Sequence, residues 1–127
     1  KNSISSEILL IGVTVLTSLD QKDLSDIGVS NDLRDQIISL FNIGKKGGID
    51  GIVCSPNDLA YLKEEEMDSF ITVCPGIRVK AESGGQKRTS TIHDAINIGA
   101  DYLVVAREII SSSDPHKVIN EIDSYFI

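Results

Sequence analysis

A cluster of cationic residues follows an apolar stretch in the middle of the chain. Residues 70–74 read Phe-Ile-Thr-Val-Cys and lead into a Pro-Gly turn, which Arg78 follows. The polar segment 84–88, Gly-Gly-Gln-Lys-Arg, comes later in the same predicted loop, which runs from about residue 76 to about residue 90. Glycine lets backbone N–H groups approach an anion closely, and the arginine guanidinium makes paired hydrogen bonds to phosphate. These residues therefore predict a phosphate clamp, and the alternative for the same pattern is a solvated surface loop.

The overall charge makes such a cluster unusual. The chain has 127 residues, a formal net charge of −7 at pH 7 and 41% hydrophobic residues. This length and hydrophobic content are typical of a single folded domain, here residues 1–127. The acidic balance argues against binding to nucleic acid or to an anionic membrane, because both need a basic surface. Any bound anion must therefore be small and held by a local group of cations.

The placement of cysteine and histidine gives no metal site. Cys54 and Cys74 each lie in an apolar, strand-like run, and His93 and His116 are far apart at the starts of predicted helices. No pair of them has the spacing of metal ligands, so we expect no metal and no cofactor. Two cysteines are too few for a disulfide framework, which favours buried, reduced thiols in a cytoplasmic protein.

Apolar runs and amphipathic stripes alternate along the chain. Short unbroken apolar runs are typical of strands buried on both faces, and stripes at helical spacing are typical of amphipathic helices. The predicted strands are residues 8–15, 50–54, 70–74 and 102–106. The predicted helices begin at the capping residues Asp20, Ser30, Ser55, Ser90 or Thr91, and Asp114. This alternation predicts an α/β fold with a parallel sheet covered by helices, and a flat, Rossmann-like sheet is one form that it can take.

The carboxyl ends of parallel strands meet at one edge of the sheet, where binding residues gather. Arg78 follows the third predicted strand and Arg107 follows the fourth. We therefore expect the two guanidinium groups to face each other across a short gap, which favours the phosphate clamp over the surface loop. In eight-stranded α/β barrels the phosphate site often includes a short extra helix, and residues 108–111 are the candidate for it here.

Five motifs in this order carry a family resemblance. They are Val-Thr-Val-Leu-Thr-Ser (13–18), Asp-Gly-Ile-Val-Cys-Ser-Pro (50–56), Pro-Gly-Ile-Arg (75–78), Gly-Gln-Lys-Arg (85–88) and Gly-Ala-Asp-Tyr-Leu-Val-Val-Ala-Arg (99–107). The set resembles the second half of the orotidine 5′-monophosphate decarboxylases, α/β-barrel enzymes of de novo pyrimidine synthesis. The resemblance runs from about residue 8 to about residue 115. It implies that the chain forms half of a TIM (β/α)8 barrel, with four parallel strands each followed by a helix.

The resemblance also implies roles for individual residues. Thr17 matches the hydroxyl residue that touches the pyrimidine ring. Arg78 and Arg107 match the two phosphate-binding arginines, and Gln86 matches the loop glutamine that bridges phosphate and base. Ala106 stands where the family usually has a glycine whose N–H meets the phosphate, so an added methyl group there could crowd the ligand. The implied ligand is a nucleotide monophosphate such as orotidine or uridine 5′-monophosphate.

The family's catalytic motif has no counterpart in the chain. Its Asp-x-Lys-x-x-Asp pattern, in which the lysine protonates the carbon that loses CO2, belongs to the first half of the barrel. Residues 20–26 read Asp-Gln-Lys-Asp-Leu-Ser-Asp, but the last aspartate comes one position too late and the segment is predicted to be a helical turn. We therefore expect no catalytic residue here and no decarboxylation by the chain without the other half.

Four strand–helix units would leave a barrel open. The predicted edge strands, 8–15 and 102–106, would have unpaired backbone groups, and the inner face of the sheet would expose apolar side chains. We therefore expect a partner, either a chain with the N-terminal half of the barrel or a second copy. Two alternatives to an enzyme part stay open: a non-catalytic remnant that binds nucleotide phosphate, and a structural half-barrel that mediates interactions.

Overall fold

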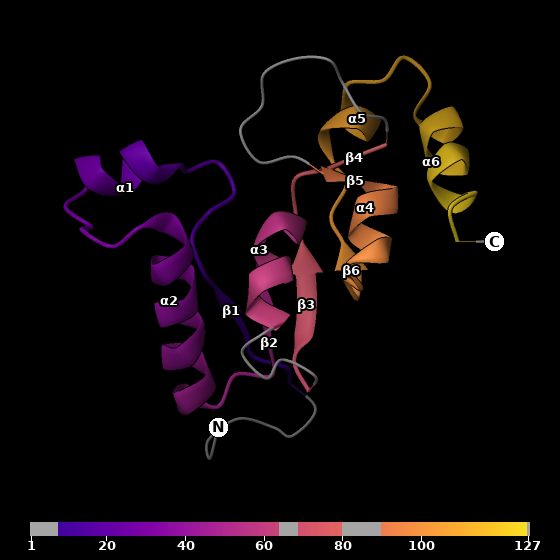
Figure 1. Ribbon diagram of the computed structural model, residues 1–127. Helices are drawn as coiled ribbons and strands as arrows, with labels where there is room; N and C mark the ends of the chain where they lie inside the picture. Colours follow the sequence, from indigo (N-terminus) through magenta and orange to yellow (C-terminus); the bar gives the residue numbers. More distant parts are fainter. Residues whose placement is uncertain (1–7, 64–68, 80–89, 127) are drawn as a thin grey trace.

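A four-stranded parallel sheet forms the centre of the fold (Figure 1). The computed structural model describes residues 8–63, 69–79 and 90–126. The strands, in their spatial order, are β1 (Ile11–Val13), β2 (Gly51–Val53), β3 (Ile71–Cys74) and β6 (Tyr102–Leu103). Every neighbouring pair is parallel, which confirms the predicted α/β fold with a parallel sheet. The outer strands are shorter than predicted, because each pairs on one side only and over two or three residues.

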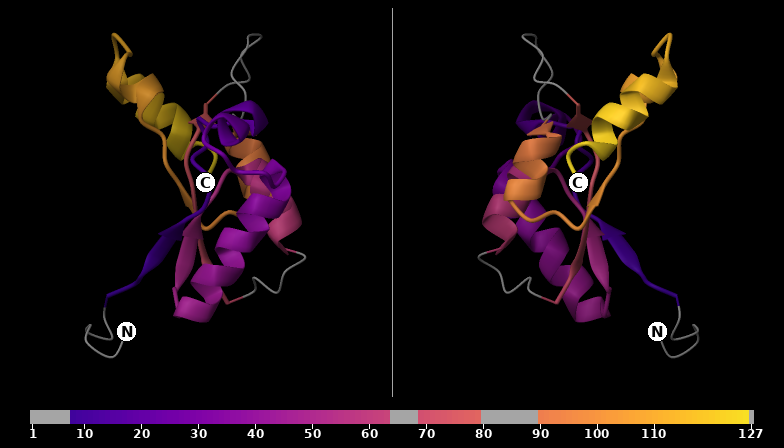
Figure 2. Two further views of the ribbon diagram at one scale, coloured as in Figure 1. Left: turned by 90° about the vertical axis from the view of Figure 1, so that its left-hand side faces the viewer. Right: turned by 90° about the vertical axis from the view of Figure 1, so that its right-hand side faces the viewer.

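Helices separate the strands along the chain. They are α1 (Gln21–Asp26), α2 (Leu33–Gly47), α3 (Pro56–Leu62), α4 (Ile92–Asn97), α5 (Arg107–Ile110) and α6 (Pro115–Asp123). Figure 2 shows α2, α3 and α4 on one side of the sheet. The order strand, helix, strand repeats as predicted, with α1 and α5 as additional short helices at the ends of β1 and β6.

The predicted helix caps are confirmed with one exception. Asp20, Ser55, Thr91 and Asp114 each accept a hydrogen bond from the backbone N–H three residues later. The prediction of Ser30 is wrong, because α2 begins after Asp32, whose Oδ1 accepts a hydrogen bond of 2.8 Å from the N–H of Asp35. A carboxylate is an ionised acceptor and also complements the positive end of the helix dipole, so the later start is favoured.

One face of the sheet packs against these helices and forms the core. Ile52 on β2 and Cys74 on β3 are fully buried there, and Phe41 of α2 meets the ring of Phe70 edge-on with 5.2 Å between ring centroids. Other fully buried members are Ile37, Leu59, Leu62, Ile92 and Ala95. Gly51, next to Ile52 in β2, must be a glycine, because an added Cβ would collide with the backbone carbonyl oxygen of Ile71 in β3. The core therefore lies between one face of the sheet and α2 to α4.

The other face of the sheet is open. Strand register places Val13, Val53, Val73 and Tyr102 in one row across all four strands, on the side away from Ile52. Val13 is 57% exposed and Tyr102 is 60% exposed, although both are large apolar or aromatic residues. A continuous uncovered row of this kind is expected when a sheet forms only part of a barrel, whose interior is filled by inward-pointing side chains.

Two aspartates fasten the amino ends of the strands. Asp50, just before β2, accepts a hydrogen bond of 2.9 Å from the N–H of Leu10 through Oδ2. Asp101, just before β6, accepts 2.8 Å hydrogen bonds from both the N–H and the hydroxyl of Thr72, and its own N–H donates back to that hydroxyl at 2.9 Å. In both cases the residue two positions earlier is a glycine with positive φ, 76° and 77°, which ends the preceding helix. The Gly-x-Asp pattern thus ends a helix and then fixes the register of the next strand.

Candidate functional site

Arg78 lies on a short strand that leaves the carboxyl end of β3. Gly76, with φ of 77°, turns the chain, and β4 (Ile77–Arg78) then pairs in parallel with β5 (Ser90–Thr91). The sequence predicted one long loop from about residue 76 to about residue 90, so this pair corrects that prediction. Ile77 and Val79 are each 5% exposed, and they anchor the segment on either side of Arg78. The alternation of apolar, charged and apolar residues was the sequence signal for this strand.

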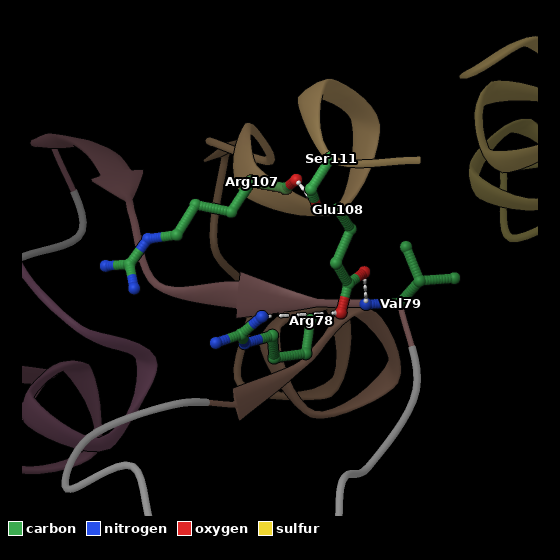
Figure 3. Close-up of polar contacts among 5 residues, drawn as sticks. All are labelled: Arg78, Val79, Arg107, Glu108 and Ser111. Atoms are coloured by element: carbon green, nitrogen blue, oxygen red, sulfur yellow. Dashed lines mark hydrogen bonds and ion pairs between the residues drawn. The ribbon is translucent and has the colours of Figure 1, made fainter. Parts of the chain in front are cut away.

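Arg107 begins α5 at the carboxyl end of the neighbouring strand, β6. The predicted short helix at 108–111 is found at Arg107–Ile110. Ala106 precedes it with φ of −130°, and its carbonyl oxygen accepts from the N–H groups of Ile109 (3.1 Å) and Ile110 (3.0 Å). The hydroxyl of Ser111 donates to the carbonyl oxygen of Arg107 at 2.6 Å (Figure 3). Because φ at Ala106 is negative, this backbone does not call for a glycine.

Glu108 connects the two arginine-bearing segments. Its Oε2 accepts a hydrogen bond of 2.7 Å from the N–H of Val79, and its Oε1 lies 3.8 Å from Nη1 of Arg78. The side chains of Arg78 and Glu108 are 17% and 21% exposed. Figure 3 shows the side chains of Arg78 and Arg107 extending toward the same side. Sequence reasoning missed Glu108, although its place directly after Arg107 in a short helix put it close to the predicted clamp.

The other predicted site residues lie further away or outside the described structure. Thr17 is half-buried in the turn after β1, which a hydrogen bond of 2.9 Å from Leu19 N–H to Leu16 carbonyl closes. It belongs to the same edge of the sheet as the arginines, but β2 separates β1 from β3, which puts the two strands about 10 Å apart. Gln86 falls in residues 80–89, outside the described residues. The structure therefore places Arg78 and Arg107 on two segments that Glu108 joins, and Thr17 two strands away from them.

A buried carboxylate near the site belongs to a helix cap. Asp58 is 2% exposed, and its Oδ2 accepts from the N–H of Ser55 at 3.2 Å while its own N–H donates to the Ser55 hydroxyl. The hydroxyl of Tyr61 donates to its Oδ1 at 2.6 Å. These contacts form a capping box at the start of α3, so Asp58 stabilises that helix. The same holds for Asp20 and Asp23, which cap α1 reciprocally, so the segment 20–26 is the helical turn that was predicted.

The two cysteines meet at the carboxyl ends of β2 and β3. Both are free thiols, 1% and 0% exposed. A hydrogen bond with Cys54 lowers the pKa of the Cys74 thiol, against the opposing effects of burial and of the charges on Asp58 and Asp101. The buried, reduced thiols predicted from the sequence are therefore found, and Cys74 lies directly before the Pro-Gly turn that leads to Arg78.

Neither a metal cluster nor a membrane-spanning helix occurs in the described residues. No three His, Cys, Asp or Glu side chains come together there in a way that could hold a metal ion. The helices within the described ranges are all too short or too polar to cross a bilayer.

The curated proteins that the chain resembles belong to one family. The chain is 44% identical over 116 residues to an orotidine 5′-phosphate decarboxylase of Coxiella burnetii, and 46% identical over 116 residues to that of Vibrio campbellii. Each alignment covers 91% of this chain, but only 49% and 50% of the relative. The chain thus spans about half the length of the curated relatives that it matches.

Solved structures show the same proportion. The crystal structure of orotidine 5′-phosphate decarboxylase from Lactobacillus acidophilus superimposes with a TM-score of 0.77 and 32% identity, over 95% of this chain and 50% of that one. An uncharacterized conserved protein from Geobacillus kaustophilus gives a TM-score of 0.68 at 27% identity and a similar coverage, 95% of this chain and 51% of that one. The four-stranded parallel sheet with its open face therefore corresponds to half of a TIM barrel. The family model described as "Orotidine 5′-phosphate decarboxylase / HUMPS family" matches residues 2–122, and the chain belongs to that family.

Proposed function

We propose that this chain is the phosphate- and base-binding half of an orotidine 5′-phosphate decarboxylase. The observation that carries the proposal is the convergence of Arg78 and Arg107 at the carboxyl ends of neighbouring parallel strands. Two guanidinium groups on adjacent elements suit a phosphate monoester, because each offers several N–H donors in a fixed plane. Thr17, about two strand spacings away, would then contact the base of the same nucleotide. Gln86 is assigned to the bridge between phosphate and base by its motif alone.

The backbone at Ala106 is compatible with this role. Its N–H lies at the entrance to α5, beside Arg107, and its negative φ does not require glycine. We expect the methyl group of Ala106 to keep the phosphate farther from that N–H than a glycine would. The Ala106→Gly variant tests this directly, and tighter phosphate binding by the variant would show that the methyl group crowds the ligand.

The catalytic lysine and aspartates would come from a partner that completes the barrel. The described sheet ends at β1 and β6 and exposes Val13, Tyr102 and Val104 on its open face. Covering these side chains and pairing both edge strands requires further parallel strands. A chain with the N-terminal half of the barrel supplies both the strands and the Asp-x-Lys-x-x-Asp motif. A second copy would supply only the strands, and the product would bind nucleotide without decarboxylating it.

Calorimetric titration with uridine 5′-monophosphate tests the binding function. We expect Arg78→Ala and Arg107→Ala each to weaken binding by about tenfold or more, the cost of one charged hydrogen-bonding partner. Arg34→Ala is the matched control, because Arg34 lies on α2 over the ring of Tyr61. Uridine, which lacks the phosphate, should bind weakly and equally to all of these proteins. No binding of the nucleotide to folded wild-type chain would end this proposal and leave a structural half-barrel as the function.

Light scattering after size-exclusion chromatography tests the partner. We expect the chain alone to self-associate, and to form a defined complex when the N-terminal half of a family member is added. Decarboxylation of orotidine 5′-monophosphate should appear only in that complex. A stable monomer at all concentrations, or turnover by the chain alone, would contradict the assignment. The free, buried thiols of Cys54 and Cys74 support a reducing compartment such as the cytoplasm for this activity.

A further inference from the structure

Glu108 contacts the Arg78 segment at two points. Glu108 binds the N–H of Val79 through Oε2 at 2.7 Å and approaches Nη1 of Arg78 through Oε1 at 3.8 Å (Figure 3). The first contact is a short, charge-assisted hydrogen bond. The second is longer than a hydrogen bond, so it acts on the guanidinium through charge. One carboxylate oxygen therefore holds the backbone of Val79, and the other places a negative charge beside the guanidinium of Arg78.

The hydrogen bond makes Glu108 a structural link between α5 and β4. The peptide groups of Val79 are held on both sides, because the carbonyl oxygen accepts a hydrogen bond of 3.2 Å from the hydroxyl of Tyr125. Val79 itself is 5% exposed, so its N–H has little access to water once the side chains are packed. Loss of the carboxylate oxygen would leave a buried donor without its partner, and the segment that carries Arg78 would shift.

The hydrogen bond of Glu108 holds Arg78 in place, but the negative charge of Glu108 disfavours an anion bound to Arg78. Glu108 carries a negative charge within 4 Å of the guanidinium that is assigned to phosphate, and it directly follows the second arginine in the chain. Both side chains are only about one-fifth exposed, so water screens the interaction incompletely. A carboxylate in this place satisfies part of the charge of Arg78 before any ligand arrives, and it repels a phosphate dianion.

We propose that Glu108 is a positioning residue that orients Arg78 through Val79 and, by its charge, competes with phosphate for Arg78. This inference rests on the proposed function, since it assigns Arg78 to phosphate. It means that the affinity of the site is held below the value that two arginines could provide. Tight binding of a nucleotide monophosphate would slow release of the product, and a nearby carboxylate weakens phosphate binding without removing either arginine.

Two variants separate the two roles of Glu108. Glu108→Gln keeps an amide oxygen that can accept from the N–H of Val79, but it removes the negative charge. Tyr125→Phe removes the hydrogen bond on the other side of Val79 and leaves every charge near Arg78 in place. A third variant, Glu108→Ala, loses both the charge and the acceptor. Circular dichroism confirms that each variant is folded before titration.

The titrations use uridine 5′-monophosphate, inorganic phosphate and uridine. Glu108→Gln should bind the nucleotide and inorganic phosphate about threefold to tenfold more tightly than wild type, the effect of removing one partly exposed ion pair. Its affinity for uridine should not change, which a general structural effect would not explain. Tyr125→Phe should not tighten phosphate binding, and Glu108→Ala should bind phosphate less tightly than Glu108→Gln.

The possible failures are distinct. If wild type binds the nucleotide and Glu108→Gln binds it equally or more weakly, the inference about Glu108 is overturned while the proposed function stands. If Glu108→Gln tightens uridine as much as the nucleotide, the effect does not involve phosphate and the inference is also overturned. If neither wild type nor Glu108→Gln binds any phosphate ligand, the proposed function is overturned first, and the role of Glu108 falls with it.

Discussion

The contact between Asp101 and Thr72 gives the sharpest test of how the fold positions the two arginines. It joins β3, which leads to Arg78, to the start of β6, which leads to Arg107. Three hydrogen bonds make the contact: two from Thr72 to Oδ2 of Asp101, at 2.8 Å each, and one from Asp101 N–H to the Thr72 hydroxyl, at 2.9 Å. Thr72 is 3% exposed, so its N–H depends on this carboxylate.

Asp101→Ala should lower the free energy of unfolding by about 2–3 kcal/mol. The variant loses hydrogen bonds to a charged group and leaves the buried N–H of Thr72 without its partner. The loss is not larger because Asp101 itself is exposed to solvent. Thr72→Val keeps the shape and the backbone N–H but loses the hydroxyl, so about 1–2 kcal/mol is expected. In the double variant the two losses should not add, since both remove the same contact.

Urea denaturation followed by circular dichroism measures these changes, because the chain has no tryptophan. The matched control is Asp26→Ala, an exposed aspartate at the end of α1, which should change the stability by less than about 0.5 kcal/mol. A loss below about 0.5 kcal/mol for Asp101→Ala, or full additivity in the double variant, would refute the reasoning. The same variant should also weaken nucleotide binding, because β6 and Arg107 would lose their register against β3.

Three further predictions concern packing, acid stability and thiol chemistry. Gly51→Ala should cost about 3 kcal/mol in urea denaturation, because the new Cβ meets a backbone carbonyl of β3 that cannot move aside; a loss below about 1 kcal/mol would contradict the packing described. Hydrogen bonds from the side chain and the backbone of Thr91 lower the pKa of Asp94 in the folded protein. The cap therefore stabilises the fold fully at pH values above the usual aspartate pKa. This contribution is lost as the pH falls through the lowered pKa. Asp94→Asn should therefore flatten the acid limb of the stability profile, and an unchanged limb would show that the cap is not formed. Cys54→Ala removes the hydrogen bond that lowers the pKa of the Cys74 thiol, so thiolate absorbance of Cys74 should appear at a higher pH than in wild type, and the same or a lower pH would show that the two thiols do not interact.

Local rules predicted most of the secondary structure. Asp20, Ser55, Thr91 and Asp114 cap helices as expected, because a side-chain acceptor at a helix start acts over three residues and needs no distant partner. The prediction of Ser30 was wrong, because Asp32 caps α2 and its carboxylate also complements the positive end of the helix dipole. The apolar runs predicted the strands, but not where pairing ends, which depends on the neighbour that each strand finds.

The contacts of the candidate site were less predictable. The β4–β5 pair joins residues 77–78 to residues 90–91, and no local pattern announces a pairing over that distance. Glu108 was missed because its two contacts are with Arg78 and Val79, a segment about 30 residues earlier in the chain. A carboxylate beside a predicted anion site looks unfavourable in sequence, and only the positions of its two oxygens show what each one does.

The order of residue types was enough to determine an α/β chain with parallel strands, because strand and helix periodicity and capping are local properties, and five motifs in order were enough to indicate its family. The tertiary structure decided the rest: which face of the sheet stays open, how Asp101 and Asp50 fix the strand register, and how Glu108 joins β4 to α5. These depend on contacts between segments that are distant in sequence. The free energy of such a contact exists only when the intervening chain has folded to bring both partners together.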